Sequence, residues 1–347
     1  MFRSRNRFVS LCALMLLLLI LVSCGKKDSA DDRAVRIGFS SVSETYLLER
    51  WNRDLKIFTS AARDLGAEVI FQIVPGNSRE QITQIQYLMD QDIDVLVVIP
   101  QDMEMLAGIL KKVHDRGIPV LAYDRPVMGV PITGYISFDN REVGRLFSRA
   151  LLEEVPSGNY LIVNGSVRDN NSFEVNKGVY EVLEPYIRSG AVTVVEEIWL
   201  EEWSFDEALE KIGAFLDTGR SIDAVSAAND QIADAAIRLL AERQLAGKVA
   251  VVGQDADLLS CQRVVEGTQL MTVYKPIPRL ATRAAELAVA FARRTPPEPE
   301  QEIDNKSGRM IPFYVETPVA VFKDQMDSTV IRDGFHSRED VYRNLGE

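Results

Sequence analysis

The sequence is poor in the residues on which zinc binding, disulfide bonds and histidine-based catalysis depend. It has three cysteines and two histidines in 347 residues, and His114 and His336 lie far apart in the chain. Two isolated histidines argue against a zinc site and against a Ser-His-Asp triad. Cys12 and Cys24 belong to the N-terminal leader region, so only Cys261 remains for the body of the protein, and no disulfide framework is expected. We therefore expect neither a metal nor a cofactor.

Signatures of nucleotide and nucleic-acid binding are also missing. No GxGxxG turn, GxxxxGK[ST] loop or GxSxG elbow joins a strand pattern to a helix pattern. The formal charge is -12, and it becomes about -15 when the first 23 residues, which hold three arginines and no acidic residue, are removed. An acidic surface argues against nucleic acid as a partner. A helix-turn-helix, which a sugar-responsive repressor would need, is absent before the main body.

The first 24 residues have the pattern of an export signal. Three arginines precede an apolar run from Leu11 to Val22, which is too short to cross a bilayer comfortably. The following Ser23-Cys24 completes a segment that resembles the lipobox of bacterial lipoproteins, in which the matching cysteine is diacylated and becomes the N-terminus. An ordinary signal peptide with an incidental cysteine is the alternative. We expect a signal peptide over residues 1–23, a tether over 24–34, and an exported protein anchored through Cys24 to a bacterial membrane, on its periplasmic or cell-surface side.

Apolar strand-like runs and amphipathic helical patterns alternate through the rest of the chain. Such alternation is typical of parallel sheets covered on both faces by helices. Because the series restarts after residue 158, we expect two doubly wound α/β lobes. The expected strands are 35–39, 68–74, 95–99, 119–123, 160–163, 192–198, 224–227, 249–252, 270–274 and 318–322. The expected helices are 46–65, 79–89, 103–113, 173–183, 205–216, 232–242 and 279–292.

Polar side chains follow five of the expected strands. Ligands of open parallel sheets bind at the carboxyl ends of the strands, and carboxylate, amide and guanidinium groups suit vicinal hydroxyls. Any single such residue could instead be a helix N-cap or a turn former, and we prefer that interpretation for Asp230 and Asp257. Taken together, the groups predict a pocket for a polyhydroxyl ligand: Asp124-Arg125, Asp169-Asn170-Asn171, Asn229-Asp230, Asp255-Ala256-Asp257 and Lys275.

An aromatic side chain would complete such a pocket, because a sugar ring has an apolar face. Trp203 lies in an acidic loop after an expected strand, so we interpret it as a ligand-stacking residue. Trp51, on an amphipathic helix, and Trp199, in a strand pattern, are interpreted as core residues.

The same segments resemble the xylose-binding members of the ribose- and galactose-type periplasmic binding protein family, which serve ABC sugar import. The resemblance runs from about Val35 to Ser337. Upstream it departs from the family pattern at Ser40 to Leu47, where those members have a shorter loop with acidic residues and an arginine. The matching stretches are 48–51, 95–100, 121–125, 135–140, 169–171, 253–257, 271–277 and 333–336.

The resemblance implies two doubly wound parallel-sheet lobes of the type I periplasmic binding protein fold, joined by a three-strand hinge. The N-terminal lobe would comprise 35–139 plus 276–309, and the C-terminal lobe 140–275 plus 310–347. The implied ligand is D-xylose or a closely related aldopyranose, bound between the lobes of a monomer and delivered to an ABC permease in the membrane by hinge closure. The implied ligand-binding residues are Arg50, Asp124, Arg125, Asp169, Asn171, Trp203, Asn229, Asp255 and Lys275.

Two other functions remain open from the residues alone. The protein could be a sensor that presents bound sugar to a chemoreceptor or histidine kinase, and only its partner would distinguish this from transport. A sugar-modifying enzyme could pair two of the three carboxylates Asp124, Asp169 and Asp255. The neighbouring Arg125 and Lys275 argue against this, because they would keep the carboxylates ionised and unable to act as acids. We therefore expect that the protein is not an enzyme.

Overall fold

The computed structural model describes residues 33–345 apart from 43–47 and 75–77, and it leaves out the side chains of residues 42, 48–51 and 74. The expected signal peptide, tether and Cys24 anchor therefore lie outside the described residues, except for 33 and 34. Residues 36–347 form one unit, and residues 1–35 are a separate one, of which only 33–35 are described.

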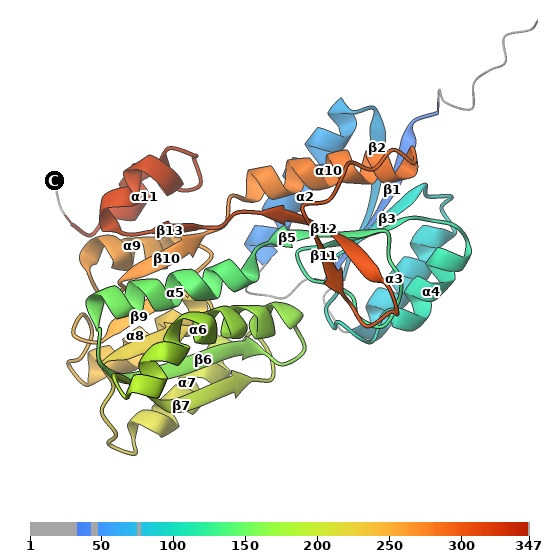
Figure 1. The fold of residues 1–347 in the computed structure, drawn as a ribbon. Helices are drawn as coiled ribbons and strands as arrows, with labels where there is room; N and C mark the ends of the chain where they lie inside the picture. The colour runs from blue at the N-terminus through green and yellow to red at the C-terminus, as the bar shows by residue number, and fades with distance from the viewer. Residues whose placement is uncertain (1–32, 43–47, 75–77, 346–347) are drawn as a thin grey trace, which may run out of the picture. The chain divides into compact units, whose positions relative to one another are not determined.

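A seven-stranded sheet, here called the first sheet, has the strand order β11-β12-β5-β4-β3-β1-β2 (Figure 1). Its pairs β1–β3, β3–β4, β4–β5 and β5–β12 are parallel, whereas β11 and β12 form an antiparallel hairpin at the edge. Every residue of β3 and β4 is buried, as expected for strands covered on both faces. The strands are β1 (Val35–Val42), β2 (Ala67–Val74), β3 (Val95–Val98), β4 (Val120–Tyr123), β5 (Gly134–Phe138), β11 (Gln301–Asp304) and β12 (Met310–Glu316).

A six-stranded sheet, the second sheet, has the order β13-β10-β9-β8-β6-β7. All its pairs are parallel except β10–β13. Its strands are β6 (Gly158–Ser166), β7 (Val192–Leu200), β8 (Ala224–Ala227), β9 (Ala250–Gln254), β10 (Met271–Tyr274) and β13 (Val319–Val321).

Helices cover both faces of each sheet (Figure 1). In the first lobe, defined by the first sheet, α3 (Ser78–Met89) and α4 (Ala107–Asp115) cover one face, while α2 (Leu48–Asp64) and α10 (Ile277–Ala292) pack together on the other. In the second lobe, one core lies under α5 (Asn140–Glu154) and α6 (Asn170–Ser189). The other lies under α7 (Phe205–Leu216) and α8 (Asp230–Glu242). The remaining helical segments are α9 (Leu258–Glu266), η1 (Lys323–Gln325), η2 (Asp327–Ile331) and α11 (Arg338–Tyr342).

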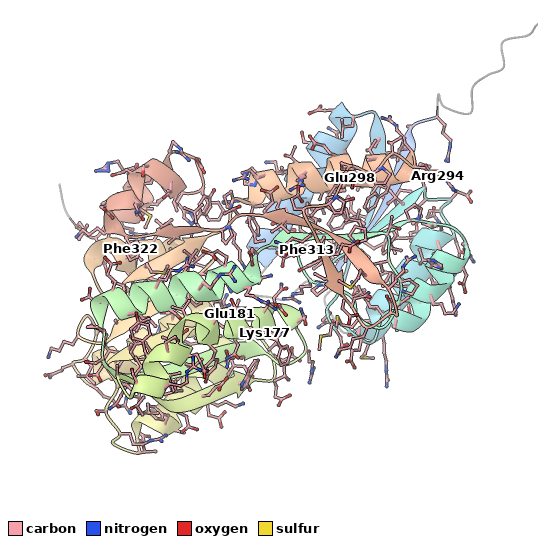
Figure 2. The ribbon with its side chains drawn as sticks, viewed as in Figure 1. Lys177, Glu181, Arg294, Glu298, Phe313 and Phe322 are labelled. Carbon is pink, nitrogen blue, oxygen red and sulfur yellow. The ribbon has the colours of Figure 1, made fainter. Side chains whose placement is uncertain are left out.

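Two glycines allow α5 and α6 to approach closely. A Cβ atom added at Gly144 would lie 1.9 Å from the Val175 carbonyl oxygen, and one added at Gly178 would lie 1.9 Å from the Arg141 carbonyl oxygen. Ion pairs flank this contact: Arg145 on α5 pairs at 2.9 Å with Glu181 on α6, which Figure 2 labels. The pairs are partly exposed, so the backbone contact and the apolar core, rather than the charges, hold the two helices together.

Most predicted elements are present, but the structure adds elements that were not predicted, among them β5, β11, β12, α5 and α9. The predicted ranges 224–227 and 205–216 coincide with β8 and α7, but the helix predicted from Met103 begins at Ala107. The hairpin strand β11 was not predicted, because its sequence Gln-Glu-Ile-Asp is charged and it lies at an edge that needs no apolar run.

The chain changes sheet after β5, after β10 and after β12. The predicted lobe boundary at residue 309 is wrong for residues 310–316. These residues form β12, which pairs in parallel with β5 of the first sheet. The third change of sheet therefore falls after Glu316. Across the described ranges, the longest and most apolar helices still fall short of what a membrane crossing requires.

Candidate functional site

The first group of predicted site residues follows β4 and is here called the first corner: Asp124 and Arg125, with Tyr135 and Ser137 of β5. Asp124 adopts a positive φ of 63° and is buried. Its N–H donates to the Ile136 carbonyl at 2.8 Å. Its carbonyl oxygen accepts from the Ser137 hydroxyl at 2.8 Å and from the Tyr135 hydroxyl at 3.0 Å. These contacts fix the turn by which the chain leaves β4.

Tyr135 and Ser137 adjoin the candidate site, and the position of polar residues after strands did not point to them. They alternate along β5, so their side chains share one face of the strand and both reach Asp124. Burial raises the pKa of the Tyr135 hydroxyl well above its usual value, so this hydroxyl stays a donor. Their period-two spacing in an otherwise apolar strand is the sequence signal that could have identified them.

The second group follows β9 and β10 and is called the second corner: Asp255, Ala256 and Asp257, with Lys275. Asp255 and Ala256 both have positive φ, 101° and 53°. Non-glycine residues in this region cost about 1–3 kcal/mol each and are held by their surroundings, commonly at binding sites. The Asp255 N–H donates to the Val273 carbonyl at 2.8 Å, and Lys275 Nζ lies 3.5 Å from Asp255 Oδ1. That oxygen is buried and accepts no hydrogen bond from the described residues, so it has unused acceptor capacity beside the Lys275 ammonium.

Asp169 lies at the centre of a third set of contacts. It is the N-cap of α6, where its Oδ1 accepts from the Asn171 N–H at 2.9 Å. Its Oδ2 accepts from Trp203 Nε1 at 3.1 Å and pairs with Arg125 Nε at 2.9 Å. Burial raises the pKa of the Asp169 carboxyl, while Arg125 and the two N–H donors oppose that shift. The predicted cap at Asp169 is therefore present, and its role in ligand binding stays a prediction, since a helix cap can also be part of a binding site.

Three contacts join the first corner to the second lobe. They are the Arg125–Asp169 ion pair, a hydrogen bond at 3.0 Å from Asn171 Nδ2 to the Asp124 carbonyl, and a weaker one at 3.4 Å from the Tyr135 hydroxyl to Asn171 Oδ1. Arg125 and Asp169 are both about 95% buried. A buried ion pair is costly unless each charge keeps its hydrogen bonds. Arg125 of the first lobe and Asp169 of the second therefore each need the other to remain buried as charged groups.

Trp203 is placed between the core and the site. Its side chain is buried in the cluster under α7 and α8. Its ring lies against Gly165 so closely that a Cβ atom there would be 2.2 Å from Cη2. One edge reaches the site through the bond to Asp169, and ligand stacking remains a prediction. Trp199, predicted to be core, is only half-buried and stacks on Phe173 with ring centroids 4.9 Å apart.

The remaining strand-end residues lie at helix starts. Asn229 is buried and caps α8, with its Oδ1 accepting from the Ile232 N–H at 2.9 Å. The interpretation as an N-cap is confirmed for the position of Asp257 and is wrong for Asp230. Asp230 is the first residue of α8 and is 1% exposed, and Asp257 occupies the N-cap position of α9 without a side-chain cap bond. Arg50 and Trp51 lie on α2, and their side chains are outside the described residues.

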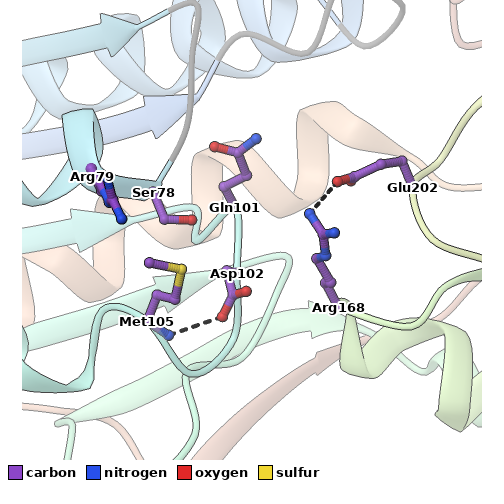
Figure 3. A pocket seen from close by; sticks show the side chains of 7 residues that line it. All are labelled: Ser78, Arg79, Gln101, Asp102, Met105, Arg168 and Glu202. Atoms are coloured by element: carbon purple, nitrogen blue, oxygen red, sulfur yellow. Dashed lines mark hydrogen bonds and ion pairs between the residues drawn. The ribbon is translucent and has the colours of Figure 1, made fainter.

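A cavity of about 310 Å³ has charged and polar walls that include Arg168 and Glu202, the neighbours of Asp169 and Trp203 (Figure 3). Arg168 and Glu202 form an ion pair, and across the cavity Asp102 accepts from the Met105 N–H at 2.9 Å. A second cavity of about 730 Å³ is lined in part by Tyr135 and Asn171. Within the described ranges, no three acidic, histidine or cysteine side chains gather as metal ligands.

Two doubly wound α/β lobes are also found in known proteins. A family model for the periplasmic binding protein domain matches residues 47–295. The chain belongs to this family. It is 40% identical over 316 residues to the D-xylose-binding periplasmic protein of Haemophilus influenzae, covering 91% of this chain and 94% of that protein. It is 39% identical over 338 residues to the Escherichia coli protein of the same description, covering 97% and 99%.

Solved structures show the same fold. A carbohydrate transporter solute-binding protein from Chloroflexus aurantiacus, in complex with D-glucose, superposes with a TM-score of 0.81 at 24% identity, covering 89% of this chain and 98% of that one. An ABC transporter solute-binding protein from Clostridium phytofermentans with bound β-D-glucose gives a TM-score of 0.80 at 24% identity, covering 88% and 99%. The predicted fold class and family are therefore confirmed. The family and these relatives are named for binding, in agreement with the expectation that the protein is not an enzyme.

Proposed function

We propose that this protein is the substrate-binding component of an ABC sugar importer and that its ligand is D-xylose. Two observations together support the proposal. The chain is 39–40% identical to two D-xylose-binding periplasmic proteins over nearly their whole length, and the predicted polar residues lie at strand ends. Sugar hydroxyls both donate and accept, so carboxylates with adjacent cations suit them.

The two corners would contact the same sugar from different lobes. Asp124 and Arg125 would bind it from the first lobe, and Asp255 and Lys275 from the second, with Asn229 and Asn171 adding amide contacts. Arg50 is carried only by the resemblance. Because such a ligand favours the arrangement in which both lobes touch it, binding would close the hinge and present the liganded form, as a monomer, to a membrane permease.

The titration of a soluble form, residues 25–347, with a panel of pentoses and hexoses tests the proposal. We expect D-xylose to bind best. Glucose has the same ring hydroxyl arrangement and one further hydroxymethyl group, so it should bind more weakly, by about 1–3 kcal/mol or more if the added hydroxyl is desolvated. Ribose and arabinose should bind poorly, because one hydroxyl points in another direction. A ranking with ribose or glucose above xylose would refute the sugar assignment. It would instead indicate that residues 40–47, where the chain departs from the family pattern, determine which sugar binds.

Lipid anchoring is the second part of the proposal. The sequence Leu21-Val22-Ser23-Cys24 supports diacylation of Cys24 after removal of residues 1–23. The acyl chains would hold the protein on the membrane beside its permease. Cys24→Ser should move the protein from the membrane fraction to the soluble fraction. Continued membrane retention of that variant would point to a different anchor.

A further inference from the structure

The second corner depends on a buried network behind it. Asp230 and Thr272 are 1% and 0% exposed, so neither can contact solvent, and neither was predicted to bind the ligand. Asp230 Oδ2 accepts from the Asp257 N–H at 3.0 Å and from the Thr272 hydroxyl at 2.8 Å. Asp230 Oδ1 accepts from Gln269 Nε2 at 2.9 Å. The carboxylate therefore ties the start of α8 to β10 and to the loop after β9.

Thr272 completes the network. Its hydroxyl donates to Asp230 and accepts from the Ala256 N–H at 3.2 Å. Together with the bond from the Asp255 N–H to the Val273 carbonyl, three successive backbone N–H groups, of residues 255 to 257, are held. These are the residues that include the two positive φ angles, a conformation that persists only where the surroundings enforce it.

The Asp230 carboxylate is buried at a cost in free energy, which indicates that its hydrogen bonds to the loop have a role. Burial raises the pKa of Asp230 well above its ordinary value, with the charges of Asp257 and Asp255 adding to the effect. Gly253 on the adjacent strand leaves room for it, since a Cβ atom there would lie 2.4 Å from Asp230 Oδ1. An apolar side chain could fill the same space, but it could not hold the loop N–H groups.

We propose that Asp230 and Thr272 are positioning residues for sugar binding, which hold the strained loop 255–257 so that the Asp255 carboxylate and Lys275 face the ligand. This rests on the proposed function. The two residues act through the loop and do not touch the sugar.

The test compares two substitutions at one buried position. Thr272→Val keeps the shape and removes the hydroxyl, whereas Thr272→Ser keeps the hydroxyl. We expect Thr272→Val to weaken D-xylose binding about tenfold in calorimetric titration, the equivalent of one lost hydrogen bond of this kind, and Thr272→Ser to bind within about threefold of the unaltered protein. Ile212→Ala, which is buried on α7 away from the corner, should lower the melting temperature and leave the affinity unchanged.

Two further readouts separate positioning from general stability. In a cycle with Asp255→Asn, the combined loss of affinity should be smaller than the product of the single losses, because both changes act through Asp255. Hydrogen exchange of the Ala256 and Asp257 amides should speed up in Thr272→Val and return in Thr272→Ser. If Thr272→Val does not fold, Asp230→Asn takes its place in the titration, the cycle and the hydrogen exchange. The new amide NH2 group would face the Asp257 N–H, the Thr272 hydroxyl and Gln269 Nε2, which are themselves donors.

Unchanged amide exchange in Thr272→Val, an affinity equal to that of the unaltered protein, or losses that multiply in the cycle would overturn the proposal. If the unaltered protein binds no sugar of the panel, the proposed function fails on its own, and the amide exchange still decides whether Asp230 and Thr272 hold the loop.

Discussion

The two corners of the candidate site hold an aspartate at a positive φ through different contacts. Each has an aspartate with positive φ after a parallel strand, and each aspartate N–H donates to the next strand, Ile136 in one and Val273 in the other. Among the described residues, the contacts named for the second corner come from its own lobe, from Asp230, Thr272 and the Val273 carbonyl. The first corner is held by Tyr135 and Ser137 and also by Asn171 of the other lobe.

This difference suggests that the corners have different parts in recognition. The contacts described for the second corner can form before the lobes meet, whereas those that the first corner makes with Asn171 and Asp169 form only when they do. Sugar binding would then begin on the second lobe and be completed by the first, which couples occupancy of the site to closure.

The largest effect should come from breaking the pair that joins the lobes. Arg125→Ala leaves Asp169 buried without its cation, and removing one partner of a buried pair costs about 3–5 kcal/mol. We expect xylose affinity in calorimetric titration to fall by more than about a hundredfold. Arg149→Ala, which removes an exposed pair with Glu142, is the matched control and should change little. Near-normal binding by Arg125→Ala would mean that the first corner is not part of the site.

Trp203 connects the second lobe's core to Asp169, and two variants separate these roles. Trp203→Ala should destabilise the empty protein by about 3–5 kcal/mol, because the ring fills core space against Gly165. Trp203→Phe keeps most of the ring and loses the bond to Asp169, so its main effect should be on affinity, about tenfold. Thermal melts and titrations of both variants check this. Full affinity in Trp203→Phe would assign Trp203 to the core alone.

Asp255→Asn tests the second corner without changing its shape. One acceptor oxygen becomes a donor next to Lys275, so the expected loss of sugar affinity is about 1–3 kcal/mol, with little change in melting temperature. The comparison of corners predicts that this loss is smaller than that of Arg125→Ala, since no contact between lobes is broken. An unchanged affinity would remove Asp255 from the site.

The smallest effect should be the pH dependence caused by Asp169, whose pKa is raised by burial. Arg125, the Asn171 N–H and Trp203 Nε1 all donate to Asp169, while the charge of Asp124 adds to the rise of its pKa. These donors need the ionised form, so xylose affinity should begin to fall at a pH above the ordinary aspartate pKa as the solution is acidified. The free energy of unfolding of the sugar-free protein should instead rise as the solution is acidified. A carboxyl whose pKa is raised in the folded state stabilises that state most below its unfolded pKa, and this stabilisation is lost as the pH rises through the folded pKa.

Titrations and unfolding curves of the unaltered protein and Asp169→Asn across this pH range check both directions. A step in affinity that persists in Asp169→Asn would belong to another group.

The sequence predicted most of the parallel strands, because strands buried on both faces need apolar runs such as Val95 to Val98. It did not predict β11, which is charged and at an edge, nor the parallel strands β5 and β12, which pair with each other. Strand-end reasoning named Asp124, Asp169 and Asp255, which the structure places in buried polar contacts, and their role in binding stays a prediction. It assigned Asp230 wrongly, because a capping position and a buried acceptor network share the same local pattern and differ only in contacts distant in sequence.

The central claim is that one sugar contacts both corners, and a crystal structure of the D-xylose complex of residues 25–347 tests it most directly. We expect sugar hydroxyls within hydrogen-bonding distance of the carboxylates of both Asp124 and Asp255, with the Arg125–Asp169 pair intact. A sugar bound to one corner only, or bound elsewhere in the protein, would contradict it.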